Sequence, residues 1–69
     1  MPTVVLNGCE RAFPDGATVA DTVLASGAPS DGRGVAVALD GEVVPRAQWT
    51  VRELADGGHV EVLHAVQGG

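Results

Sequence analysis

The chain has 69 residues, a formal net charge of −5 and a pI near 4.5, which is enough for one domain with a small core. Its acidic balance, with four basic residues in all, would repel phosphate backbones and argues against nucleic acid as a partner. No apolar run approaches the roughly 20 residues that cross a bilayer, so we expect no membrane partner either.

Two strands joined by a tight turn are predicted at the start of the chain. Residues 3–7 are rich in β-branched side chains, which suits a strand. Asn7-Gly8 is a strong hairpin signal. Residues 10–13 would return as the second strand before Pro14-Asp15-Gly16 breaks the pattern.

A short helix is predicted next. Thr18 and Asp21 have the spacing of a capping box. Three apolar residues then share one helical face: Val19, Val23 and Leu24. These signals predict a helix over residues 19–26, which Gly27 can end in a left-handed conformation. The polar, glycine-rich segment 28–34 predicts a loop.

The next segments predict a second hairpin. Residues 35–39 are continuously apolar, as in a central strand buried on both faces. Asp40-Gly41 is a hairpin signal, and residues 42–44 would form the returning strand. Pro45 stops that strand because it cannot donate to a sheet ladder, and one irregular or helical turn is expected at 46–49.

The remaining chain completes the predicted sheet. A short extended piece is expected at residues 50–54, a turn at 56–58 and the last strand at 59–66. The single helix is the one candidate crossover between parallel strands, so the first and last strands should be adjacent and parallel in the centre. The sequence thus predicts an α+β fold of the β-grasp (ubiquitin-like) type over residues 1–66, with a mixed sheet of four to five strands and one helix packed across one face. Residues 67–69 would form a flexible tail.

A small apolar patch is predicted on the open face of the sheet. Alternation along the last strand places Leu63 and Ala65 on the face that the helix leaves uncovered. We expect Val5 of the first strand beside them. An apolar patch next to the tail would be a docking surface.

Residue groups that could catalyse a reaction alone are missing from the sequence. His59 and His64 would lie on opposite faces of their strand and could not bind one metal together. Cys9 is the single cysteine, so it can form no internal disulfide, and we interpret it as an incidental turn residue. A lone thiol favours a reducing compartment, and Met1-Pro2-Thr3 lacks the features of a signal peptide. We expect a cytoplasmic, monomeric protein that is not an enzyme and binds no metal or cofactor.

The diglycine ending suggests that the chain carries an acyl group on its terminus. Gly68 and Gly69 have no side chains, so this backbone could enter a narrow passage. Chain ends are usually mobile, so an acyl group on Gly69 could reach another protein's active site. The alternative is an idle terminus in a chain with ten glycines.

Residues 35–49 are similar to the corresponding segment of the ThiS family, the sulfur carriers of thiamine thiazole biosynthesis, and Val44-Pro45-Arg46-x-x-Trp49 is the most specific part. Residues 4–8 and 60–69 also resemble that family, so the resemblance covers essentially the whole chain. Gln67 departs from it, because a small residue is expected before the diglycine.

The resemblance implies chemistry at the terminus. An E1-like adenylyltransferase of the ThiF type would use ATP to adenylate the Gly69 carboxylate, sulfur would displace AMP, and a thiazole synthase of the ThiG type would accept sulfur from the thiocarboxylate. Gly68 and Gly69 would thread toward the nucleotide. Five residues would contact partners: Leu63, Ala65, Val5, Gln67 and Arg46. Arg46 would pair with a carboxylate on this chain or on a partner, and Trp49 would anchor its irregular connection.

Three other functions stay open. The small subunit of molybdopterin synthase, or another sulfur carrier, would share the fold and the diglycine end. A ubiquitin-like protein modifier would join Gly69 to lysines of its targets, although the chain has no lysine of its own for self-linkage. An interaction module would leave the terminus unused.

Overall fold

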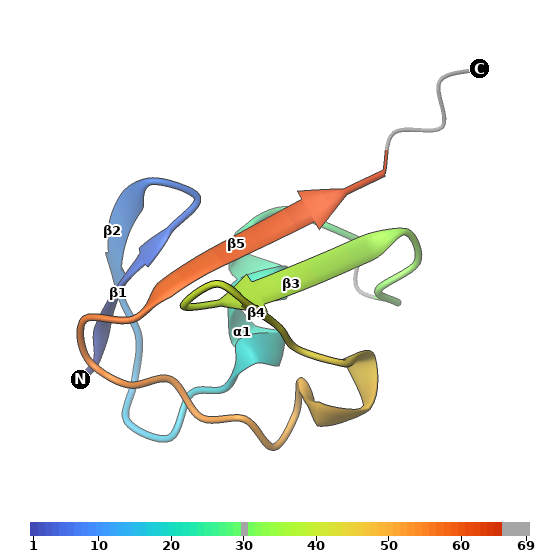
Figure 1. Cartoon of the computed structure of the whole chain (residues 1–69). Coiled ribbons are helices and arrows are strands. Elements are labelled where there is room, and N and C mark those ends of the chain that lie inside the picture. Colours follow the sequence, from blue (N-terminus) through green and yellow to red (C-terminus); the bar gives the residue numbers. More distant parts are fainter. Residues whose placement is uncertain (30, 66–69) are drawn as a thin grey trace.

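The computed structural model describes residues 1–29 and 31–65. The elements in chain order are β1 (Thr3–Leu6), β2 (Cys9–Ala12), α1 (Val19–Ala25), β3 (Val35–Leu39), β4 (Glu42–Val43), the 3₁₀ helix η1 (Arg46–Gln48) and β5 (His59–His64). Val66 and the predicted tail at 67–69 lie outside the described residues. Figure 1 shows α1 lying across one face of the sheet that the strands form.

The strands form one mixed sheet in the order β2-β1-β5-β3-β4. β1 and β5 are parallel, and the other neighbouring pairs are antiparallel. The prediction that the first and last strands are adjacent and parallel in the centre is therefore confirmed. A mixed sheet of five strands with one helix on one face is the predicted β-grasp fold.

Both predicted hairpins form, and their backbone angles explain the residues used. Asn7 and Asp40 each have a φ of 50°, and the glycine after each also has a positive φ. Two consecutive positive φ values are what a two-residue hairpin turn of type I′ requires, and Asn-Gly and Asp-Gly adopt them readily. These turns set the register of β1 with β2 and of β3 with β4.

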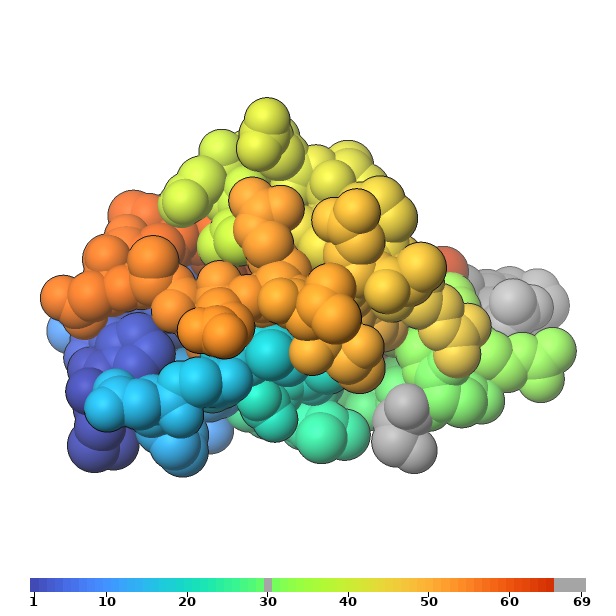
Figure 2. All heavy atoms as spheres, turned by 90° about the horizontal axis from the view of Figure 1, so that it is seen from below, coloured from blue at the N-terminus to red at the C-terminus, as the bar shows by residue number. Residues whose placement is uncertain are grey.

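The core lies between α1 and the inner face of the sheet. Its buried side chains come from β1, β3 and β5, from the helix and from the connections: Val4, Leu6, Phe13, Ala17, Val19, Val23, Val37, Leu39, Val44, Trp49, Leu54, Val60 and Val62. The segment between β4 and β5, yellow to orange in Figure 2, supplies Trp49 and Leu54 and closes the core on the side that this view shows. None of the helices in the described ranges is long and apolar enough to span a bilayer.

The helix begins as predicted but presents a different face. Asp21 accepts a hydrogen bond from the backbone N–H of Thr18 at 2.8 Å, as the capping-box spacing predicted. Thr22 is fully buried, whereas Leu24 is 60% exposed, so the prediction that Leu24 shares one helical face with Val19 and Val23 is wrong. With only seven residues, the helix buries the positions i, i+3 and i+4 counted from Val19, and Leu24 falls outside that stripe.

The predicted burial of residues 35–39 on both faces is also wrong. Val37 and Leu39 are buried, but Ala36 between them is exposed. One helix covers only one face of this sheet, so the other face of β3 stays open to solvent. Small alanines on that face explain why the segment reads as continuously apolar.

Candidate functional site

The candidate site is the end of β5, where the chain leaves the sheet. β5 ends at His64, two residues before the predicted boundary at Val66, and the backbone N–H of Ala65 donates to the carbonyl of Gly34 at 2.7 Å. In Figure 1 this end of β5 lies far from the N-terminus. Three predicted site residues lie outside the described ranges: Gln67, Gly68 and Gly69.

Apolar side chains gather on the open face beside this end. The register places Leu63 opposite Ala36, and it places Ala38 opposite Val43. Paired residues of antiparallel strands project to the same face, so these four residues form one surface, which we call the open-face patch. Leu63 is 64% exposed and Val43 is 76% exposed.

Val5 does not lie beside Leu63, contrary to the prediction. Val5 pairs with His59, at the other end of β5. Leu63 is four residues farther along the strand, which is about 13 Å at roughly 3.3 Å per residue. The partners of Leu63 come from β3 and β4 instead. Val43 was missed by sequence reasoning, although alternation through the Asp40-Gly41 hairpin would have placed it on this face.

Trp49 is an anchor, as predicted. Its side chain is 7% exposed, and its Nε1–H donates to the carbonyl of Val44 at 2.9 Å. A buried indole needs such a partner for its N–H. The interaction ties the start of the η1 connection to its end, so the Val44-Pro45-Arg46-x-x-Trp49 motif folds back on itself.

Arg46 is exposed at the start of η1, and its Nη2 donates to the backbone carbonyl of Asp31. Within the described residues Arg46 therefore contacts a carbonyl oxygen, and not a carboxylate as predicted. Its role as a partner contact stays a prediction.

An open hollow of about 540 Å³ lies at the exit of β5. It is lined by Pro29, Asp31, Arg33, Gly34, His64 and Ala65. Arg33 brings positive charge here, on a chain with a net charge of −5. The chain thus leaves the sheet between this polar hollow and the open-face patch.

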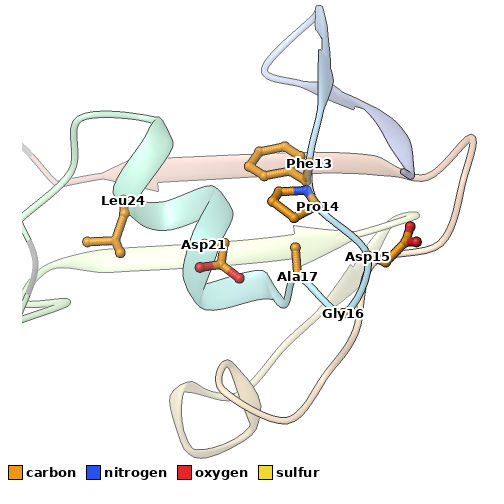
Figure 3. Close-up of a pocket in the computed structure, with 7 residues that line it drawn as sticks. All are labelled: Phe13, Pro14, Asp15, Gly16, Ala17, Asp21 and Leu24. Carbon is orange, nitrogen blue, oxygen red and sulfur yellow. The ribbon is translucent and has the colours of Figure 1, made fainter.

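A second hollow, of about 440 Å³, lies between the turn after β2 and α1. Figure 3 shows Phe13 and Leu24 with Asp15 and Asp21 around it. Asp15 pairs with the Met1 amine at 2.7 Å, and Asp21 caps α1. Both carboxylates already have partners, and this hollow offers no further chemistry.

Metal-binding and thiol chemistry find little support in the described residues. These ranges contain no group of three or more His, Cys, Asp and Glu side chains placed to hold a metal. Cys9 is exposed and is the first residue of β2, where it pairs with Leu6, so the prediction that it is a turn residue is wrong. His59 and His64 sit at opposite ends of β5.

Comparisons with known proteins agree with the resemblance in the sequence. A model of the ThiS family matches residues 4–69. The crystal structure of a thiamine biosynthesis protein (ThiS) from Geobacter metallireducens is similar to this chain, with a TM-score of 0.70 and 26% sequence identity, over 97% of this chain and 99% of that one. A search of curated proteins gives no match.

Proposed function

Because this chain belongs to the ThiS family, we propose that it is a sulfur carrier of thiamine biosynthesis whose working atom is the carboxyl carbon of Gly69. The family match over residues 4–69 is the observation that carries the proposal. In this role the chain is a protein co-substrate and not an enzyme. It supplies recognition and reach, and its partner enzymes supply the chemistry.

The proposed reaction converts a carboxylate into a thiocarboxylate in three steps. A carboxylate is a poor electrophile because its charge is delocalised over two oxygens. An E1-like adenylyltransferase of the ThiF type joins the Gly69 carboxylate to the α-phosphate of ATP, and pyrophosphate leaves. The terminal sulfur of a persulfide then attacks the acyl carbon and AMP leaves. A second thiol cleaves the sulfur–sulfur bond, which yields the Gly69 thiocarboxylate and a disulfide.

The thiocarboxylate is then the sulfur donor for a thiazole synthase of the ThiG type. A thioacid is more acidic than an ordinary thiol, so at neutral pH it is an anionic nucleophile. ATP belongs to the adenylating partner, and this chain needs no bound cofactor. Consumption of ATP and a thiol reductant supports a cytoplasmic location.

Two features of the described surface support a docking role. The open-face patch exposes Leu63 two residues before Ala65, so a partner that covers the patch meets the chain as it leaves the sheet. Exposed apolar patches of this kind mark protein interaction sites. The negative net charge of the chain suits a partner with a basic surface, because complementary charge raises the association rate.

The test is to mix the chain with ATP and a ThiF-type enzyme and to read its intact mass. We expect an adenylated species and, with a persulfide donor, a mass gain of one oxygen-to-sulfur exchange. A variant that lacks Gly69 should fold normally and support no thiazole formation. Thiazole formation by that variant would contradict the proposal.

Three further observations separate the other candidates. Sulfur delivery to the large subunit of molybdopterin synthase alone would favour a molybdopterin role. High-mass conjugates that leave a diglycine remnant on target lysines would favour a protein modifier. Full activity of a variant with residues appended after Gly69 would favour an interaction module with an idle terminus.

A further inference from the structure

Gly32 is buried, although it lies in the exposed loop between α1 and β3. Its φ is +73°, a conformation that residues with a side chain rarely adopt. A Cβ at this position would come to 2.9 Å from Cζ3 of Trp49 and 3.2 Å from Nε of Arg46. The indole and the guanidinium group therefore occupy the space that a side chain at position 32 would need.

The 3₁₀ geometry of η1 explains why these two side chains meet at one glycine. Side chains three residues apart in a 3₁₀ helix point in the same direction, and Arg46 and Trp49 have this spacing. The indole is held by its bond to Val44, and the carbonyl of Trp49 accepts the N–H of Ala20 in α1 at 2.9 Å. One side of the contact is thus fixed by the core.

The other side of the contact leads to the end of β5. Arg46 binds the carbonyl of Asp31, directly before Gly32. The carbonyl of Gly32 accepts the N–H of Val35 at 3.2 Å, and the carbonyl of Gly34 accepts the N–H of Ala65 at 2.7 Å. β1 ends at Leu6, opposite Val60, so β1 does not extend as far along β5 as Ala65. The loop on the other side therefore supplies the backbone partner that holds Ala65 in place.

We propose that Arg46 and Trp49 clamp Gly32 so that the loop 31–34 fixes the point and direction in which the chain leaves the sheet. This rests on the proposed function, in which Gly69 must reach an adenylating site. Arg46 is then a positioning residue. Gly32 is required because any side chain at this position would collide with Trp49. A fixed exit at Ala65 orients the chain toward the adenylating site before reaction, and such positioning lowers the barrier to reaction. Docking depends on the open-face patch, which is on other residues.

The test compares Gly32→Ala with Gly41→Ala. Both glycines have a positive φ, but a Cβ at Gly41 has no atom within 4 Å, so the control carries the backbone strain without the clash. In Gly32→Ala we expect the Ala65 amide to exchange about tenfold faster, because its local opening becomes easier. The Val62 amide, bound to Asn7, should be unchanged. Equal Ala65 exchange in the two variants, or an unprotected Ala65 amide in the wild type, would overturn the clamp.

Adenylation kinetics test the positioning role. For Gly32→Ala we expect kcat to fall about fivefold with KM unchanged, because positioning is lost while docking is kept. Gly41→Ala should keep the wild-type kcat. A rise in KM alone, or no change in kcat, would overturn the role in positioning.

Arg46→Lys is the second variant, and its exposed site keeps the test valid if Gly32→Ala does not fold. Lysine keeps the charge but lacks the planar guanidinium fork, so we expect the same faster Ala65 exchange and lower kcat. Wild-type kinetics and exchange in Arg46→Lys would overturn the role of the Arg46 guanidinium group in the clamp. If the wild-type chain is not adenylated at all, the proposed function fails, whereas the exchange comparison still decides the clamp.

Discussion

The side-chain amide of Asn7 binds both backbone polar groups of Val62. Oδ1 accepts the Val62 N–H at 2.8 Å, and Nδ2 donates to the Val62 carbonyl at 3.3 Å. β1 ends at Leu6, opposite Val60. The side chain of Asn7 therefore extends the ladder to the next partner on β5 after the backbone has turned away into the hairpin.

Replacing Asn7 should destabilise the fold. In Asn7→Ala both bonds are lost at a partly buried site, and alanine must adopt a φ of 50°. We expect a loss of about 1–3 kcal/mol in the free energy of unfolding, measured by chemical denaturation. Asn7→Gly is the control, because glycine accepts the backbone angle and removes only the two bonds. A Gly variant as stable as the wild type would show that these bonds contribute nothing.

The topology was predictable because local signals agree with it. Asn7-Gly8 and Asp40-Gly41 each specify a tight hairpin, and a chain with one helix has one way to join parallel strands. The capping spacing of Thr18 and Asp21 located the helix start. The hairpin and capping signals act between residues close in sequence, which is why they could be read without a structure.

Register and long-range contacts were not predictable in this way. The position of Val5 opposite His59 depends on where β1 stops and on how β5 is aligned with it. The contact of Gly32 with Trp49 joins segments that no local pattern connects. The glycine-rich composition of the loop 28–34 was visible in the sequence, but the close approach of Trp49 and Arg46 to Gly32 was not.

Leu63 should be important for docking. In Leu63→Asp we expect KM for the adenylating enzyme to rise about tenfold, which is about 1.4 kcal/mol of binding energy, because a charge replaces an apolar contact. Leu24→Asp is a matched control, since Leu24 is 60% exposed compared with 64% for Leu63 and lies on α1, on the other side of the sheet. Steady-state kinetics give the comparison. Equal KM values for the two variants would contradict a docking role for the patch.

Val43 tests how far the patch extends toward the sheet edge. It is 76% exposed and pairs with Ala38, so Val43→Asp should raise KM about threefold to tenfold without changing the melting temperature. Val51 is 71% exposed in the connection that follows η1, and Val51→Asp is the control with the same chemistry. A Val43 variant with the kinetics of the Val51 variant would confine the docking surface to β5 and β3.

Thr22 tests whether its buried hydroxyl or its packing stabilises the helix. Its hydroxyl donates to the Val19 carbonyl at 2.6 Å, and the residue is fully buried. Valine keeps the branched shape and leaves no unpaired donor, so Thr22→Val should change the free energy of unfolding by less than about 1 kcal/mol. Thr22→Ala removes packed atoms and leaves a void, so it should destabilise by about 1–2 kcal/mol. Thermal denaturation of both variants decides the matter: if Thr22→Val is the less stable of the two, the hydroxyl contributes more than the packing.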